Sequence, residues 1–158
     1  MSVRYKHYGK LPKEFYGVRG SFFNKPRGGL WGCRGEEWRE WCLAEEYEVD
    51  RLKKFFFFKL KRGSKVYRIK TKKDFKYLLK KYYRDESKYE GLMDTIDFVE
   101  MSKDYDAVEV VGDIVWKLRY GCDDDYKGLY SWDVPSICVL NVDKVKVVEG
   151  RRCQKTIK

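Results

Sequence analysis

Hydrophobic residues first recur at helical spacing in residues 36–47 of this chain. Trp38, Trp41, Cys42 and Glu45 fall at positions i, i+3, i+4 and i+7, so they share one face of a helix. The segment also begins with two glutamates, where the helix dipole favours negative charge. The pattern therefore predicts a helix over residues 36–47.

A second helix is predicted over residues 72–84. Thr71 and Asp74 match a capping box, with aspartate in place of the usual glutamate. The residues behind this box repeat at helical spacing and are all large and hydrophobic: Phe75, Leu78, Leu79 and Tyr82.

Shorter hydrophobic runs predict strands. The run Phe55–Phe58 has lysines on both sides and is typical of a buried strand whose charged neighbours guard it against aggregation. Further strands are predicted at 66–70, 107–111, 136–140 and 144–148. Residues 141–143 have the composition of a tight turn joining the last two strands. Residues 114–120 fit a helix or a strand equally well.

Strands with helices inserted early, followed by strands late in the chain, predict an α+β fold. We expect one compact domain over residues 1–150, with mostly antiparallel strands and two or three helices. The 158 residues can enclose one sizeable core, whereas two domains would each be unusually small. Residues 151–158 are rich in basic side chains and are expected to form a flexible tail.

The net charge of +10 is unevenly distributed along the chain. Residues 51–90 hold 16 Lys and Arg against 4 Asp and Glu, a net charge of +12, whereas residues 94–143 hold 4 against 12, a net charge of −8. One part attracts phosphate and the other repels it. This division argues against a protein that coats duplex nucleic acid. It fits an anionic partner at the basic 51–90 face, or a basic block from Lys53 to Lys81 that is only a solvated face.

Metal, disulfide and membrane chemistry are not indicated. Five cysteines, no C-x-x-C pair and a single histidine favour reduced thiols and no metal site. The run Asp123–Asp125 lacks the alternating ligands and closing glutamate of a calcium loop, so we expect a solvated loop. No hydrophobic run approaches the roughly 18 residues that span a membrane, and the N-terminus lacks a signal-peptide core. We therefore expect a cytoplasmic protein.

The segment from Asn24 to Cys33, together with the helix that follows, is the most distinctive part of the chain. It contains the one Gly-Gly pair, Gly28–Gly29, which follows Pro26 and predicts a turn with positive φ. Three of the five tryptophans lie here, and tryptophan is costly to expose. The segment therefore indicates a shaped pocket or a corner of the core.

The order of these segments resembles the ADP-ribosyltransferase superfamily. A first strand with a histidine, Tyr5–Gly9, precedes the Gly-Gly-Leu-Trp strand and the tryptophan-rich helix. Next come a basic strand and a basic helix. The segments Tyr105–Val110 and Ser136–Val145 follow them. The chain is also similar to small phage proteins that carry a Lys-Pro-x-Gly-Gly-Leu-Trp segment and a Trp-x-x-Trp-Cys helix. The resemblance covers roughly residues 3–149 and implies an ADP-ribosyltransferase-like fold with NAD as its substrate.

The resemblance also implies roles for single residues. In the superfamily a histidine or arginine on the first strand orients the nicotinamide half of NAD, which suggests His7 with the Gly9 backbone. The second strand places an aromatic or hydroxyl residue beside the ring, and Leu30–Cys33 occupies that place, with Trp31 or Cys33 at the key position.

A late acidic residue in the superfamily holds the nicotinamide ribose. The corresponding position here is Ser136, so the candidate carboxylates are Asp133, just before it, and Glu109, on the preceding strand. Either carboxylate would stabilise the positive charge that develops on the ribose as the nicotinamide bond breaks.

The remaining candidate ligand contacts follow from chemistry. Trp31 would stack on nicotinamide, Lys25 and Arg27 would donate to the pyrophosphate, and Gly29 beside Leu30 would let the backbone approach the ligand. Structural explanations stand beside these roles: His7 as a hydrogen-bonded structural residue, and Lys25 and Arg27 as a solvated loop.

The implied function is a phage-encoded transfer of ADP-ribose from NAD to a host protein or nucleic acid. One alternative is a non-catalytic phage protein that binds and inhibits a host defence factor. Another is a basic nucleic-acid-binding module in which Tyr67, Tyr77 and Tyr83, lying among lysines, stack on bases.

Overall fold

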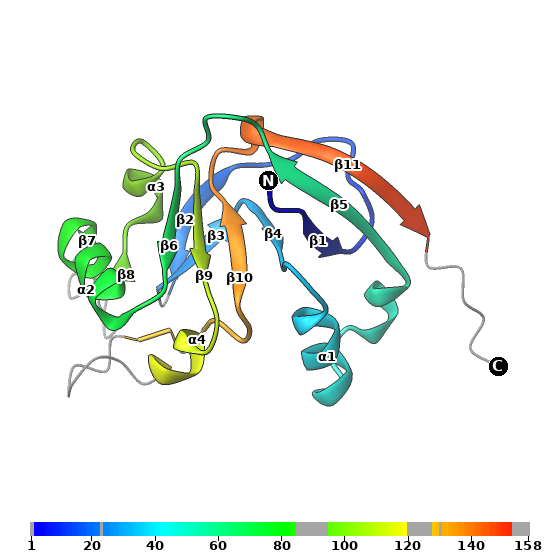
Figure 1. Cartoon of the computed structure of the whole chain (residues 1–158), viewed down its shortest axis with the longest axis horizontal. Helices are drawn as coiled ribbons and strands as arrows, with labels where there is room; N and C mark the ends of the chain where they lie inside the picture. The colour runs from blue at the N-terminus through cyan, green and yellow to red at the C-terminus, as the bar shows by residue number, and fades with distance from the viewer. Residues whose placement is uncertain (1, 23, 85–94, 120–127, 130, 153–158) are drawn as a thin grey trace.

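The computed structural model describes residues 2–22, 24–84, 95–119, 128–129 and 131–152, which form an α+β fold built on two main sheets (Figure 1). The three-stranded sheet has the order β1 (Tyr5–Tyr8), β5 (Lys54–Leu60), β11 (Val145–Arg152). The four-stranded sheet has the order β4 (Leu30–Gly32), β10 (Ser136–Val139), β9 (Ala107–Val110), β6 (Val66–Ile69). All neighbours are antiparallel except β6 and β9.

Two small strand pairs and four α-helices complete the described part of the chain. The pairs are β2 (Val18–Phe22) with β3 (Lys25–Gly28), and β7 (Tyr83–Arg84) with β8 (Thr95–Ile96). The helices are α1 (Glu37–Ala44), α2 (Lys72–Lys81), α3 (Phe98–Met101) and α4 (Ile114–Lys117). Two 3₁₀ turns, η1 (Val49–Lys53) and η3 (Val142–Lys144), precede β5 and β11.

Within the described residues, one isolated bridge joins the two main sheets. The Lys6 amide donates to the Cys33 carbonyl at 2.8 Å, and the Cys33 amide donates back to the Lys6 carbonyl at 3.0 Å. Lys6 lies on β1, in the middle of the strand that carries the histidine, and Cys33 directly follows β4. The junction therefore places these two strands side by side.

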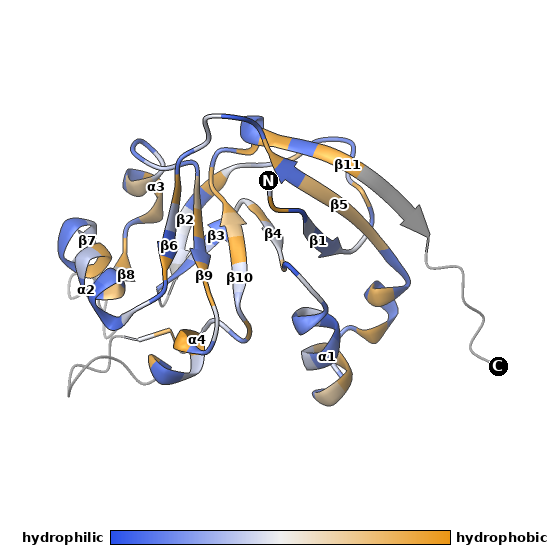
Figure 2. Ribbon diagram, in the orientation of Figure 1, coloured by the Kyte–Doolittle hydropathy of each residue, from blue (hydrophilic) through white to orange (hydrophobic). Residues whose placement is uncertain are grey.

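Hydrophobic side chains fill both faces of the four-stranded sheet. One cluster lies between the two main sheets and includes Tyr5, Phe56, Phe58 and Ile137. A larger cluster lies on the opposite face, where α2, α3 and α4 pack, and its members share almost complete burial: Phe75, Leu78, Phe98, Met101, Val108, Val110, Ile114, Val115 and Cys138. In Figure 2, where the ribbon is coloured by residue hydropathy, β5 and β10 are largely hydrophobic and α2 contains many hydrophilic residues.

The phenylalanine run alternates along β5 as a strand period requires. Phe56 and Phe58 are fully buried, whereas Phe55 and Phe57 are half-buried. Gly32 on β4 lies directly against this layer, because a Cβ built there would lie 2.7 Å from the Phe58 ring. The two sheets therefore approach more closely at Gly32 than any other residue type would allow.

Both long predicted helices form. The capping box of α2 is present on both sides, with the Asp74 amide donating to the Thr71 hydroxyl at 3.2 Å. The predicted end at residue 84 was wrong: α2 stops at Lys81, and Tyr83–Arg84 instead pairs with β8. The number of helices also exceeds the predicted two or three, because residues 98–101 and 114–117 each form a single turn.

The tight turn predicted at residues 141–143 does not make a hairpin. β10 pairs with β4 and β9, whereas β11 pairs with β5 in the other sheet. The 3₁₀ turn η3 carries the chain from one sheet to the other. The composition of a turn was visible in the sequence, but the partner of each strand is set by contacts far away in the chain.

The last described strand runs past the domain boundary predicted at residue 150. β11 continues to Arg152, where it pairs with Lys54, so the strand passes position 150. Residues 153–158 and the run Asp123–Asp125 lie outside the described residues. No helix in the described ranges is long and apolar enough to cross a membrane.

Candidate functional site

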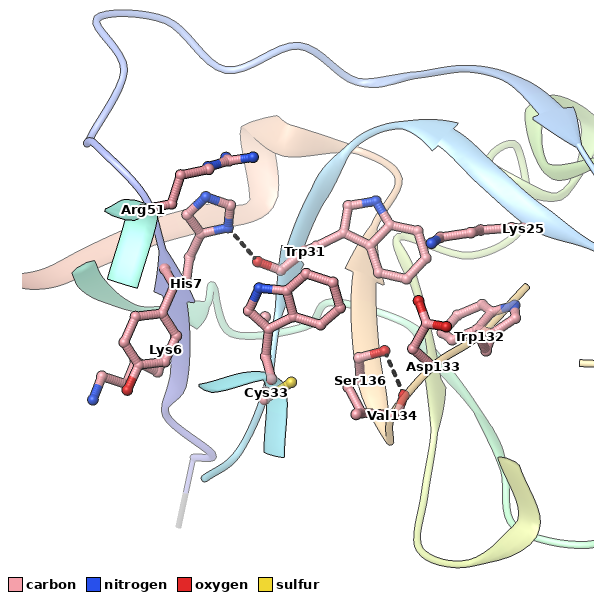
Figure 3. Close-up of a pocket in the computed structure, with 13 residues that line it drawn as sticks. Lys6, His7, Lys25, Trp31, Cys33, Arg51, Trp132, Asp133, Val134 and Ser136 are labelled. Carbon is pink, nitrogen blue, oxygen red and sulfur yellow. Dashed lines mark hydrogen bonds between the residues drawn. The ribbon is translucent and has the colours of Figure 1, made fainter. Parts of the chain in front are cut away.

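A pocket of about 230 Å³ lies at the junction of the two sheets (Figure 3). It draws side chains from β1, from the start of β3, from β4 and the residues after it, from α1, from η1 and from the segment leading into β10. Its lining residues are Lys6, His7, Tyr8, Lys25, Trp31, Gly32, Cys33, Trp38, Arg51, Trp132, Asp133, Val134 and Ser136.

His7 is held on one wall of this pocket by the backbone of β4. Its Nδ1 lies 2.7 Å from the Trp31 carbonyl oxygen, and a carbonyl can only accept, so Nδ1 carries the proton. Burial lowers the pKa of His7 below its usual 6.5, the Trp31 hydrogen bond opposes that change, and the charge of Arg51 adds to it. At neutral pH the ring is therefore neutral, with Nε2 as an acceptor.

Gly9 provides the space beside that nitrogen. Its φ of +143° lies outside the range that other residues prefer, and a Cβ there would lie 3.1 Å from His7 Nε2 and 3.2 Å from Arg51 Nη2. Arg51 is held in turn by Glu48, whose carboxylate accepts from Nη1 at 2.9 Å. Because Gly9 has no side chain, the His7 imidazole and the Arg51 guanidinium can both lie beside its Cα.

Tryptophan rings form the other walls. Trp31 meets Trp132 edge to face, with ring centroids 4.9 Å apart, and Lys25 Nζ lies 5.2 Å from the centroid of Trp31. Trp132 is fixed because its indole N–H donates to the Asn24 carbonyl at 2.7 Å. Asn24 is itself buried with φ of +58°, so the residue before β3 sets the position of the tryptophan wall.

Trp38 closes the pocket from α1, where it stacks on Trp41 at 5.0 Å. Its helix is tied to β1 at the helix start, since Glu36 accepts hydrogen bonds from Lys6, at 2.7 Å, and from the Tyr8 hydroxyl. Burial raises the pKa of Glu36, but the hydrogen bonds from Lys6 and Tyr8 outweigh it and the net direction is downward. The carboxylate therefore stays charged and anchors α1 beside the histidine strand.

Asp133 supplies the carboxylate of the pocket. The pKa of Asp133 is raised overall, because the effect of burial outweighs the lowering effect of the charges of Lys25 and Arg119. Figure 3 shows this carboxylate on the side of Lys25 and Trp132, across the pocket from His7 and Arg51. Ser136, at the position where the resemblance expects an acid, donates its hydroxyl to the Val134 carbonyl at 3.0 Å.

Cys33 lines the pocket as a structural group. The residue is 4% exposed, and its thiol donates to the Pro135 carbonyl at 3.4 Å. Burial is the main cause that raises the pKa of Cys33 to about 12. The thiol therefore stays protonated at neutral pH and is a poor nucleophile.

A second, more open hollow of about 420 Å³ shares Lys25 with the pocket and is lined also by Pro26, Arg27 and Ser131. It is here that the structure places Arg27. Lys25 thus stands at the boundary between an aromatic pocket and a basic surface.

Gly29 and Leu30 have packing roles. Gly29 has φ of +73°, and a Cβ on it would lie 2.6 Å from the Val139 carbonyl oxygen, so the glycine is needed where the turn passes β10. Leu30 is buried between the two sheets. Neither residue lines the pocket.

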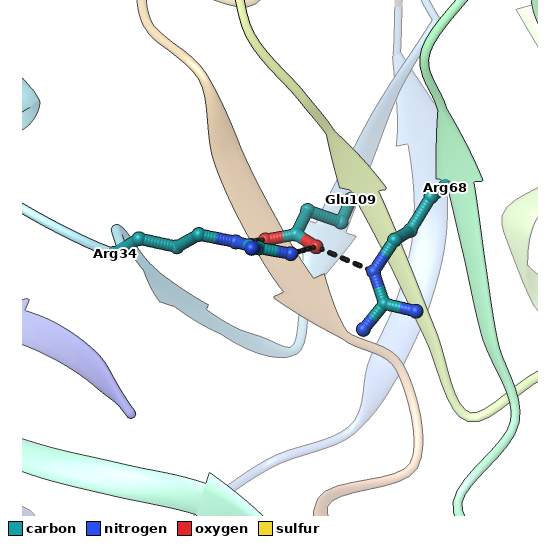
Figure 4. Close-up of polar contacts among 3 residues, drawn as sticks. All are labelled: Arg34, Arg68 and Glu109. Atoms are coloured by element: carbon teal, nitrogen blue, oxygen red, sulfur yellow. Dashed lines mark hydrogen bonds and ion pairs between the residues drawn. The ribbon is translucent and has the colours of Figure 1, made fainter. Parts of the chain in front are cut away.

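Glu109 lies apart from the pocket, in a cluster with two arginines (Figure 4). Arg34 donates to it through Nη2 at 2.7 Å and Nε at 2.8 Å, and Arg68 donates through Nε at 2.9 Å. The Glu109 side chain is 3% exposed, against 44% for Arg34 and 35% for Arg68. Both carboxylate oxygens are therefore taken up by hydrogen bonds within the protein.

Sequence reasoning missed Arg51 and used Trp38 only to define one face of a helix. Arg51 lies in a basic run with nothing to distinguish it from its neighbours, and only the fold brings it to Gly9 and His7. The helical periodicity of Trp38 was visible, but the pocket beside its face was not.

Comparison with family models, with curated proteins and with solved structures found no match.

Proposed function

We propose that this protein binds NAD in the tryptophan-lined pocket and transfers ADP-ribose from it to a target of the cell, as a phage-encoded, ADP-ribosyltransferase-like protein acting in the host cytoplasm. The observation that carries the proposal is convergence. His7 on β1, Trp31 on β4 and Asp133 before β10 are far apart in sequence, and all three line one pocket. These are the strands on which the resemblance expects the nicotinamide-binding residues.

The volumes of the two adjoining hollows support a ligand whose two halves bind in different places. A pocket of about 230 Å³ suits the nicotinamide riboside half rather than the whole dinucleotide. The adjoining hollow of about 420 Å³, with Lys25 and Arg27, suits the pyrophosphate and the remaining nucleoside. Nicotinamide would stack on Trp31, a position that Lys25 now holds through a cation–π contact.

The chemistry proposed for the pocket is a substitution at C1′ of the nicotinamide ribose. The C1′–N bond breaks and its electron pair leaves with neutral nicotinamide, while an oxygen or nitrogen of the target, or of water, forms the new bond to C1′. The proton of that nucleophile passes to solvent or to the Asp133 carboxylate. Asp133 stabilises the positive charge on the ribose, which in a part-buried setting is worth more than in water.

His7 has a positioning role in this scheme. Its Nδ1–H is committed to the Trp31 carbonyl, so Nε2 offers one acceptor to a ribose hydroxyl or to the nicotinamide amide. Because burial holds the imidazole neutral, the ring adds no charge of its own to those of Arg51 and Lys25 around the cationic nicotinamide.

The test combines NAD calorimetry with chromatography of released nicotinamide. Asp133→Asn should bind NAD with little change but release nicotinamide about 100-fold more slowly, the usual loss for one stabilising group. The matched control is Asp113→Asn, whose carboxylate is 70% exposed and pairs with Lys117. Absence of NAD binding at millimolar concentration would refute the proposal, as would equal turnover by the Asp133 and Asp113 variants.

The tryptophan wall offers a second pair of variants. Trp31→Ala should weaken NAD binding by removing the stacking surface, whereas Trp116→Ala removes a tryptophan that is 53% exposed on α4 and outside the pocket. Equal NAD affinity in the two variants would contradict the placement of nicotinamide on Trp31.

A further inference from the structure

The outer face of α2 carries lysines around an exposed tyrosine. Lys73, Tyr77 and Lys81 follow one another at intervals of four residues, so they form one stripe along the helix, with Lys80 next to it. All four are exposed, and Tyr77 is 47% exposed. The opposite face of α2 buries Phe75 and Leu78, so the helix is fixed by its core side and presents this stripe outward.

Aromatic rings are ordered behind the stripe. Tyr77 stacks on Tyr67 of β6, with centroids 5.9 Å apart and planes 13° apart, and Tyr105 meets Tyr67 edge to face at 5.3 Å. Tyr67 is held by its hydroxyl, which donates to the Asp74 carbonyl at 2.8 Å. Lys81 Nζ lies 5.7 Å from the centroid of Tyr77. The exposed ring is therefore preorganised rather than mobile, which lowers the entropy lost on binding.

The carboxylates of Asp74 and Asp104, which lie near the stripe, are both engaged within the protein. Asp74 accepts from the amides of Lys70 and Thr71, each at 3.0 Å. Asp104 accepts from the Tyr82 hydroxyl at 2.6 Å. Both carboxylates keep their negative charge, and the three lysines of the stripe outnumber them by one beside an exposed aromatic ring.

We infer that this stripe, Lys73–Tyr77–Lys80–Lys81, binds single-stranded nucleic acid. Lysines contact phosphates along the strand, while a base stacks on the fixed Tyr77 ring. A duplex keeps its bases stacked inside and would leave Tyr77 without a partner. An acidic protein would pair with the lysines but has no need of a planar ring. The inference adds a second ligand to the protein, on α2, which contributes nothing to the lining of the NAD pocket.

Fluorescence anisotropy with a short labelled oligothymidylate, in the absence of NAD, tests this binding. Tyr77→Ala should weaken binding at least about fivefold, the lower limit for losing one stacked base. Its control is Tyr16→Ala, which removes a tyrosine that is 73% exposed elsewhere and should change nothing. Because the assay omits NAD, its failure leaves the transferase proposal standing, and the reverse also holds.

Two double variants that remove the same charge distinguish binding at the stripe from general electrostatic attraction to the protein. The double change Lys73→Gln with Lys80→Gln should make the negative slope of log affinity against log salt shallower by about 1.4. Each phosphate that a lysine neutralises contributes about −0.7 to that slope, and two such contacts are lost. Lys10→Gln with Lys13→Gln removes the same charge from two exposed lysines between β1 and β2 and should leave the slope almost unchanged. Equal effects of the two pairs, equal binding of a duplex, or equal competition by polyglutamate would each overturn the inference.

Discussion

Replacing Glu109 by glutamine tests whether this carboxylate is structural or acts on substrate. Three charge-assisted hydrogen bonds of 2.7–2.9 Å end on it, and its side chain is 3% exposed. Glutamine keeps the shape but turns an N–H₂ group toward guanidinium donors, so at least one of the three bonds is lost. The two arginines would then lack their counter-charge.

The magnitude follows from burial. Removing one partner of a fully buried ion pair costs about 3–5 kcal/mol. Arg34 and Arg68 are 44% and 35% exposed, so water can hydrate both after the change. We therefore expect Glu109→Gln to lower the free energy of unfolding by about 2–4 kcal/mol, less than the fully buried case. At about 2–4 °C per kcal/mol for a chain of this size, Tm falls by about 5–15 °C.

Urea unfolding followed by tryptophan fluorescence measures this change, with nicotinamide release assayed well below Tm. The control Asp113→Asn alters an exposed ion pair and should stay within about 0.5 kcal/mol of the parent protein. Adding Arg68→Met to Glu109→Gln should cost less than the sum of the single changes, because the pair interacts directly. A Glu109→Gln variant with parental stability but no nicotinamide release would refute the structural assignment.

Four further predictions rest on single residues. Gly9→Ala should lower NAD affinity by crowding the His7 ring. Gly112→Ala also puts a side chain at positive φ (+70°) but meets no atom within 4 Å, so it should leave NAD affinity unchanged in calorimetry. The folded-state pKa of His7 is depressed, so its contribution to stability is present above the unfolded value near 6.5 and is lost as pH falls below it. Urea midpoints should therefore fall more steeply between about pH 7 and pH 5 in the parent protein than in His7→Gln; parallel profiles would contradict this. Cys33, whose pKa is raised to about 12, should resist iodoacetamide at pH 7 until the protein unfolds, as mass spectrometry of the labelled peptide would show. Thr71→Ala should lower the free energy of unfolding by about 1 kcal/mol through loss of the α2 cap, and an unchanged urea midpoint would argue against that bond.

Local signals in the sequence predicted local structure well. The capping box, the helical spacing behind it and the phenylalanine run are each confirmed, because each depends on neighbours within a few residues. The pairing of β10 with β4 rather than with β11 could not be predicted in this way. Long-range pairing is chosen by the fit of whole faces, which no short window contains.

The candidate site divides along the same line. His7, Lys25, Trp31 and Asp133 were predicted from residue chemistry and resemblance, and the structure brings them to one pocket. Glu109 was a candidate on the same reasoning, yet its neighbours Arg34 and Arg68 occupy both of its oxygens. A carboxylate's availability depends on side chains that the sequence does not show to be adjacent.

The bridge between Lys6 and Cys33 has a mechanical consequence for the pocket. His7 belongs to one sheet, and Asp133 leads into a strand of the other. The distance between these two side chains therefore depends on the angle between the two sheets. That angle is set from inside, where the Phe58 ring rests on Gly32. A methyl group added at Gly32, which itself lines the pocket, would press on the Phe58 ring from within and so change the distance across the pocket.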